Sequence, residues 1–170
     1  MKKIAQFEKI SLEQFEKDYV KLYGSSNSIN SIYNDIKLPL RATIGSAGYD
    51  FYLPFDFKLK AGDTAIVPTG IRVKMQEDWV LQIFPRSSLG FKFSLMLNNT
   101  VGIIDSDYYY SDNEGHILIK LTNNSIQKLS IELNAGSAFA QGIFFNYGIT
   151  TDDNATQIRN GGFGSTNNAN

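Results

Sequence analysis

From residue 36 onward, the sequence consists of short β-rich runs separated by turn residues, and this pattern restricts the fold more than any other feature. The runs cover residues 64–67, 71–75, 79–84, 117–121, 129–133 and 140–147. Branched and aromatic residues that alternate with polar ones indicate strands with one buried face. Many short strands with Gly, Asn and Asp between them predict an all-β fold, such as an antiparallel sandwich, a barrel or a jelly-roll-like domain.

A single amphipathic helix is predicted ahead of this β-rich part. Ser11 is the expected N-cap, and Gln14 three residues later completes a capping box. An apolar stripe follows at three- and four-residue spacing, at Leu12, Phe15, Tyr19 and Leu22. Gly24 predicts the end of the helix, and the polar residues 25–31 are interpreted as a linker. We expect the helix to pack on the surface of the domain or on a neighbouring subunit.

Composition excludes several classes of site. The 170 residues include no cysteine, which removes disulfides, thiol nucleophiles and Cys-ligated zinc, and fits a reducing cytoplasmic setting. The single histidine, His116, is predicted to be a hydrogen-bonded surface residue, because one His alone does not build a zinc site. Catalysis must then use carboxylates, hydroxyls, Arg, Lys or a hard cation.

The sequence indicates neither a nucleic acid nor a membrane as a partner. A net charge of −1 gives no reason to expect a nucleic-acid-binding face. No apolar run of the sequence is long enough to span a membrane, and residues 1–3 are not followed by the apolar stretch of a signal peptide. A length of 170 residues favours one domain with its own hydrophobic core.

Two segments combine small or hydroxyl residues with a charged side chain. In residues 46–50, Ser-Ala-Gly-Tyr-Asp, the small residues ahead of Asp50 allow the backbone to approach another group closely. An ordinary β-turn, in which Asp50 bonds its own backbone, is the alternative.

Residues 85–90, Pro-Arg-Ser-Ser-Leu-Gly, follow an apolar strand. The guanidinium and the two hydroxyls suit phosphate oxygens, although an ordinary capped loop has the same composition.

Residues 99–108 end a predicted strand with two carboxylates. Asp105 and Asp107 lie two positions apart, so on an extended strand they share one face. One of them could orient a water molecule as a general base. The alternative is a strand end finished by a polar turn, in which neither carboxylate has a chemical role.

The two remaining segments lie closer to the C-terminus. Gln141 interrupts the apolar run 138–142, and its amide needs either a structural hydrogen bond or a ligand contact. In the Gly-rich residues 159–166, Arg159 brings charge, Phe163 a stacking face, and the last residues amides and hydroxyls for anions. This is not a Walker A loop, because no Lys precedes the hydroxyls. Composition by itself favours a flexible tail.

Taken in order, the five segments resemble the five motifs of the trimeric dUTP diphosphatase (dUTPase) family. The resemblance extends from about Leu38 to Thr166 and is most specific over residues 161–166, Gly-Gly-Phe-Gly-Ser-Thr. It implies a β-clip or distorted jelly-roll-like subunit with an added N-terminal helix and an extended C-terminal arm, divided at residues 1–34, 35–148 and 149–170. It also implies a homotrimer whose active sites combine motifs from different subunits, each site being closed by an arm.

The resemblance further implies hydrolysis of dUTP to dUMP and pyrophosphate, which limits uracil incorporation into DNA and supplies dUMP for thymidylate synthesis. By position, Asp105 would activate the water that attacks the α-phosphorus. Tyr108 would pack on the deoxyribose and exclude a 2′-hydroxyl. The uracil edge, with a wall that rejects the thymine methyl, would be read by Asn99 and by backbone at Ile103, Ile104 and Leu118.

The other implied roles concern the phosphates. The phosphate chain would be held by Arg86, Ser87 and Ser88, with Gln141 nearby. The arm would bring Arg159, Gly164, Ser165 and Thr166 to the γ-phosphate and Phe163 onto the uracil. A Mg²⁺ ion would be held mainly by the phosphates and water, and Asp50 would support its outer shell or the geometry of the site.

Three features depart from the family pattern. Residues 109–114 intervene before Gly115 and are interpreted as a longer hairpin tip. Ala138 stands where an Arg often precedes the Gln of the fourth motif, and the N-terminal helix is additional. The nearest alternative is a dCTP deaminase, or a bifunctional deaminase and diphosphatase, against which Tyr108 and the Gly-rich tail argue. An alternative of another class is a regulatory protein-binding module that uses the helix and residues 109–114.

Overall fold

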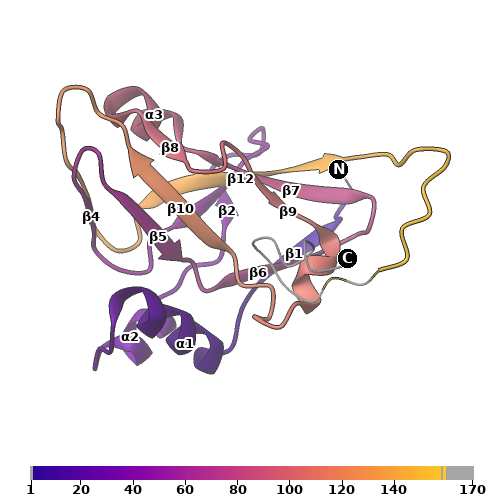
Figure 1. Cartoon of the computed structure of the whole chain (residues 1–170), viewed down its shortest axis with the longest axis horizontal. Coiled ribbons are helices and arrows are strands. Elements are labelled where there is room, and N and C mark those ends of the chain that lie inside the picture. Colours follow the sequence, from indigo (N-terminus) through magenta and orange to yellow (C-terminus); the bar gives the residue numbers. More distant parts are fainter. Residues whose placement is uncertain (1, 158, 160–170) are drawn as a thin grey trace.

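Strands dominate the computed structural model, which describes residues 2–157 and 159 (Figure 1). The largest sheet has the order β2-β3-β12-β7-β9 and is antiparallel throughout. Its strands are β2 (Leu40–Arg41), β3 (Tyr49–Tyr52), β12 (Ala138–Asn146), β7 (Trp79–Pro85) and β9 (Gly102–Ile104). The prediction of a mostly-β fold is confirmed.

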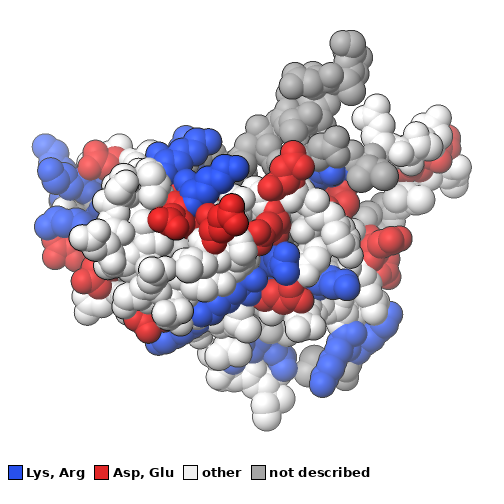
Figure 2. All heavy atoms as spheres, turned by 90° about the horizontal axis from the view of Figure 1, so that it is seen from below, with Lys and Arg blue, Asp and Glu red and all other residues white. Residues whose placement is uncertain are grey.

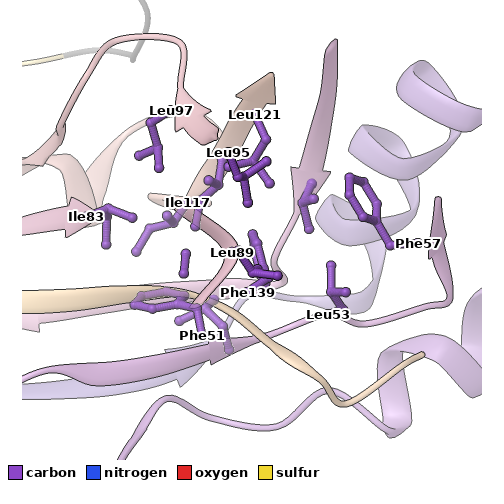
Figure 3. Packing of buried hydrophobic residues seen from close by; sticks show 14 of the residues in the cluster. Phe51, Leu53, Phe57, Ile83, Leu89, Leu95, Leu97, Ile117, Leu121 and Phe139 are labelled. Carbon is purple, nitrogen blue, oxygen red and sulfur yellow. The ribbon is translucent and has the colours of Figure 1, made fainter. Parts of the chain in front are cut away.

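A second, three-stranded sheet lies across the core from the first. Its order is β5-β10-β8, formed by β5 (Thr64–Pro68), β10 (Leu118–Asn123) and β8 (Leu95–Leu97). A smaller pair is formed by β11 (Ile131–Leu133) and β4 (Phe57–Leu59). Figure 3 shows Phe51 and Phe139 of the large sheet near Leu95 and Leu121 of the second sheet, and all four side chains are almost fully buried. Each such side chain stabilises the fold by about 1.5–3 kcal/mol through its burial.

The N-terminal residues are part of the same core. Strand β1 (Ala5–Lys9) pairs with β6 (Ile71–Met75), and helix α1 (Leu12–Tyr23) follows as predicted. Ile10 and Phe15 are 1% and 0% exposed and belong to the main hydrophobic cluster. The linker predicted over residues 25–31 is wrong in its second half, because α2 (Ile29–Asn34) begins there and buries Ile29.

The predicted capping box is half present. The hydroxyl of Ser11 accepts a hydrogen bond from the Gln14 amide at 3.1 Å, as expected of an N-cap. The Gln14 side chain does not return to Ser11; it donates to Asp18 at 2.8 Å. The Ser11 amide donates instead to a carboxylate far along the chain, Glu114, at 2.8 Å.

The connection between β9 and β10 is not a hairpin tip, so that prediction is wrong. Strand β9 pairs with β7, whereas β10 pairs with β5 and β8 in another sheet. The chain crosses between the sheets through a 3₁₀-helix, η1 (Ser106–Tyr110), and a turn. One further short helix, α3 (Ser87–Phe93), follows β7.

Charged side chains are distributed without one dominant sign. Figure 2 shows acidic and basic groups interspersed on one face of the molecule, in agreement with the net charge of −1. Within residues 2–157 and 159, none of the helices has the length and apolar character needed to cross a membrane.

Candidate active site

A cavity of about 540 Å³ lies where β9, η1 and β10 meet. Six of the residues predicted to contact a ligand line it: Asn99, Ile103, Ile104, Tyr108, Leu118 and Arg159. Gly102 lets β9 approach β7, because a Cβ there would lie 3.1 Å from the Cβ of Ile83. The cavity lining is largely apolar, and its polar members are Asn98, Asn99, Lys120 and Arg159.

Asp105 and Asp107 do not line the cavity themselves but contact the lining residue Arg159. Asp105 is the N-cap of η1, with φ −79° and ψ 158°, so the predicted extended strand ends there and does not carry both carboxylates on one face. The two carboxylates are brought together instead by Arg159. Its Nη2 donates to Oδ2 of Asp105, and its Nε donates to Oδ1 of Asp107 at 3.0 Å. The chain after β12 turns back toward η1, which makes this contact possible (Figure 1).

Tyr108 forms a buried wall of the cavity. Its side chain is anchored at the hydroxyl, which donates to the carbonyl of His116 at 2.8 Å and accepts from Nδ2 of Asn113 at 2.8 Å. Burial raises the pKa of the Tyr108 hydroxyl above its ordinary value, so it remains a donor at neutral pH. The ring can therefore offer a ligand only an apolar surface.

A second cavity, of about 370 Å³, collects three of the predicted segments. Asp50, Arg86 and Gln141 line it together with Ser87 and Ser88. The strand order β3-β12-β7 explains this, because Gln141 is paired with Asp50 on one side and with Phe84, next to the loop that holds Arg86, on the other.

The polar side chains of the second cavity already position one another. Nε of Arg86 lies 3.5 Å from Oδ1 of Asp50, and Nε2 of Gln141 donates to the carbonyl of Pro85 at 3.3 Å. A Cβ on Gly48 would lie 2.7 Å from Oε1 of Gln141, so a side chain at position 48 would displace the amide. The cluster offers a guanidinium, an amide and exposed hydroxyls, which is suitable equipment for an anion.

The two cavities have no lining residue in common, as far as the chain is described. Nor do the described residues contain a group of three or more carboxylates and His that could hold a metal ion. The contact of Asp50 is with Arg86, and its role near a metal remains a prediction. Phe163, Gly164, Ser165 and Thr166 lie outside the described residues.

One prediction about a single residue was wrong. His116 is not at the surface but fully buried, with Nδ1 2.6 Å from Oδ2 of Asp18 and Nε2 accepting from the Gly70 amide at 2.9 Å. The partners lie 98 and 46 positions away, so no local pattern indicated them. The lining residues Asn98 and Lys120 were also missed, although Asn98 is adjacent to Asn99 and Lys120 lies two positions after Leu118.

Fold and cavities together define a β-sheet protein that has a largely apolar cavity, with two carboxylates held beside it by the lining residue Arg159, and a separate cluster suited to anions. A comparison with family models identifies the class of protein, because the dUTPase model matches residues 34–167. The chain belongs to the dUTPase family.

Curated relatives agree with this assignment. A deoxyuridine 5′-triphosphate nucleotidohydrolase of Lactococcus lactis is 38% identical over 134 residues, covering 77% of this chain and 88% of the relative. One of Haemophilus ducreyi is 37% identical over 143 residues, covering 79% and 90%.

Solved structures agree as well. The crystal structure of dUTPase from Streptococcus mutans superimposes with a TM-score of 0.63 at 32% identity, covering 85% of this chain and 97% of that one. The dUTPase of Staphylococcus aureus phage phi11 reaches 0.64 at 17% identity over 91% of this chain and 98% of that one, which supports the shared fold alone.

Proposed function

We propose that the chain hydrolyses dUTP to dUMP and pyrophosphate. Family membership and the names of the relatives support the substrate. The observation that carries the proposal is the cavity lined by Asn99, Tyr108, Leu118 and Arg159, because Arg159 holds the Asp105 carboxylate beside it. A base and sugar fit the apolar part, and the phosphates then extend past the carboxylates. In the cell, this reaction would limit uracil in DNA and supply dUMP, and the lack of cysteine supports a cytoplasmic location.

Asp105 accepts the proton of the attacking water in this mechanism. The water oxygen forms a bond to the α-phosphorus, and the bond from that phosphorus to the bridging oxygen breaks, so pyrophosphate leaves. Arg159 now pairs with Asp105 and Asp107. When phosphate oxygens arrive, the guanidinium exchanges these carboxylates for the phosphates, which frees Asp105 and neutralises the developing charge.

The separation of the two cavities supports a homotrimer with shared sites as part of this proposal. Within one chain, Tyr108 and Arg86 line cavities without a common lining residue, so the anion cluster would serve the base-binding cavity of a neighbouring copy. Mixing Asp105→Asn protein with Arg86→Ala protein tests this, since some mixed interfaces carry both native residues. Recovery of activity over either parent is expected, and no recovery would contradict sharing.

A Mg²⁺ ion is expected to accompany the substrate. The described residues offer no cluster of carboxylates and His for an ion of their own, which fits a cation bound mainly through phosphate oxygens and water. Bound there, the ion would supply positive charge that offsets the charge of the phosphates. The phage phi11 dUTPase, by its description, coordinates a structural Mg(II) ion. Activity should be lost on chelation and restored by Mg²⁺.

The assay that tests the function compares dUTP with dCTP in the presence of Mg²⁺. Pyrophosphate release from dUTP and no uracil product from dCTP are expected. Deamination of dCTP would support the deaminase alternative, whose family has a related fold and a segment similar to Arg86, Ser87 and Ser88. Absence of turnover with both nucleotides would leave a regulatory protein-binding role as the better account.

A further inference from the structure

The N-terminal helix and the inserted residues 109–114 are the two parts of the chain to which the proposed mechanism gives no role. In the structure they contact each other. The segment that joins η1 to β10 lies beside α1, although the two are about 100 positions apart in the sequence (Figure 1). Hydrogen bonds join the two at Ser11, the N-cap of α1, and at Asp18, within the helix. Each of these contacts is connected to Tyr108.

The first bond is at the N-cap of α1. The Glu114 carboxylate accepts from the Ser11 amide at 2.8 Å and from its hydroxyl at 2.6 Å. Glu114 has a φ of 58°, a left-handed conformation that a residue with a side chain adopts at a cost. Burial raises the pKa of the Glu114 carboxyl, but the hydrogen bonds from Ser11 outweigh it, and the pKa is lowered overall. The insert thus provides the cap contact that Gln14 does not make.

The second bond joins the fully buried side chain of His116 to Asp18, which is mostly buried. Oδ2 of Asp18 lies 2.6 Å from Nδ1 of His116, whose Nε2 accepts from the Gly70 amide. Since Nε2 is an acceptor, the ring proton is on Nδ1 and is donated to Asp18. Gln14 donates to the same Asp18 oxygen, and the ring of Phe15 lies 6.2 Å from the imidazole. His116 is therefore fixed in place by α1 on one side and by the β5–β6 turn on the other.

The third step leads to the cavity. The carbonyl of His116 accepts the hydroxyl hydrogen of Tyr108, and Asn113 donates to the same hydroxyl. A Cβ on Gly115 would lie 2.8 Å from the Tyr108 carbonyl, so the insert folds directly onto η1. Rotation of the Tyr108 ring would break two hydrogen bonds, and the residue that accepts one of them, His116, is itself bonded to α1 through Asp18.

Strand β1 makes a further contact, with Tyr109, the next residue of η1. The Tyr109 hydroxyl donates to Glu8 at 2.7 Å, and Glu8 also pairs with Arg72 at 3.0 Å. The Arg72 guanidinium lies over the Tyr109 ring, 4.5 Å from its centre. Residues 8–18 therefore hold η1 at Tyr109 as well as at Tyr108.

We infer that the N-terminal extension and residues 109–114 act together as a positioning device for Tyr108, in which Asp18 and His116 are positioning residues that sharpen discrimination against a 2′-hydroxyl. This rests on the proposed role of Tyr108 as the wall against the sugar. The Tyr108 ring discriminates against a ribonucleotide by clashing with its 2′-hydroxyl, and the clash is effective only if the ring cannot move aside. The contact with α1 is what prevents the ring from yielding.

The test measures kcat/KM for dUTP and for UTP in matched variants. Asp18→Ala removes the acceptor of the His116 proton and should lower the dUTP/UTP ratio roughly fivefold, the worth of about one hydrogen bond. Asp18→Asn keeps an oxygen that accepts this proton and should keep the ratio within about twofold. Glu16→Ala, on the exposed side of the same helix, is the control and should leave the ratio unchanged.

Tyr108→Phe separates positioning from plain stability. It removes the hydroxyl through which the device acts, so adding Asp18→Ala to it should lower the ratio no further. A folded Asp18→Ala protein with an unchanged ratio would overturn the inference, as would an equal effect of Asp18→Ala with and without the Tyr108 hydroxyl. If Asp18→Ala does not fold, the dUTP/UTP ratio is measured in Glu114→Ala, at the exposed edge of the contact. An unchanged ratio in that variant would also overturn the inference.

The outcome is distinct from that of the proposed function. If the unaltered protein releases no pyrophosphate from dUTP, the proposed function fails. If it does so and Tyr108→Ala loses discrimination while Asp18→Ala does not, the function stands and the positioning role of α1 fails.

Discussion

The substitution Gly115→Ala should destabilise the protein by much more than a glycine replacement usually does. Gly115 has a φ of 71°, which costs an alanine about 1–2 kcal/mol. The added Cβ would also lie 2.8 Å from both the carbonyl oxygen of Tyr108 and the Cα of Tyr109. These are backbone atoms that cannot rotate away, so overpacking adds about 1–3 kcal/mol. The expected loss is about 2–5 kcal/mol in the free energy of unfolding.

Gly62→Ala is the matched control for this prediction. Gly62 has a φ of 87°, but a Cβ there would have no atom within 4 Å, so only the conformational cost of about 1–2 kcal/mol applies. Equilibrium unfolding in urea measures both variants on the same scale. The difference between them isolates the close approach of the insert to η1. If Gly115→Ala cost no more than Gly62→Ala, the reasoning about this approach would be refuted.

The remaining predictions concern the site and its supports. Asp105→Asn should abolish turnover while dUTP still binds, as checked by calorimetry beside a pyrophosphate assay, and retained turnover would remove Asp105 from its role. Deletion from Gln157 onward should cut activity severely yet leave the number of subunits in the assembly unchanged, as determined by light scattering; full activity would show that the arm is not part of the site. Burial raises the pKa of the Asp18 carboxyl, but the hydrogen bonds from His116 and Gln14 outweigh this effect, so the pKa lies below its ordinary value of 3.8. Its contribution to stability is then complete above about pH 4 and disappears as the pH falls through the lowered pKa. The stability difference between the unaltered protein and Asp18→Asn should therefore shrink between pH 6 and pH 3, and a constant difference would contradict the assignment.

The parts of the fold that depend on local pattern were predictable. Alternating runs located β5, β6, β7, β10 and β12, and Ser11 located the start of α1. Helix α2 was missed although Ile29, Ile32 and Tyr33 recur at helical spacing, because the polar residues around them suggested a linker. Short helices lack the length that makes periodicity convincing.

The parts that depend on contacts between distant segments were not predictable. Nothing near His116 in the sequence indicates that it would be buried against Asp18, and nothing near Glu114 indicates that it would cap α1. The site shows the same division. Asp105, Tyr108 and Arg86 could be singled out by motif, but the pairing of Arg159 with both carboxylates depends on how the chain after β12 turns back.

The central claim is that water attacks the α-phosphorus of dUTP with the help of Asp105. Turnover of dUTP in ¹⁸O-labelled water, followed by mass spectrometry of both products, tests it most directly. The account predicts one labelled oxygen in dUMP, none in pyrophosphate, and no labelled product with Asp105→Asn. Label in the pyrophosphate, or undiminished labelling of dUMP by Asp105→Asn, would contradict it.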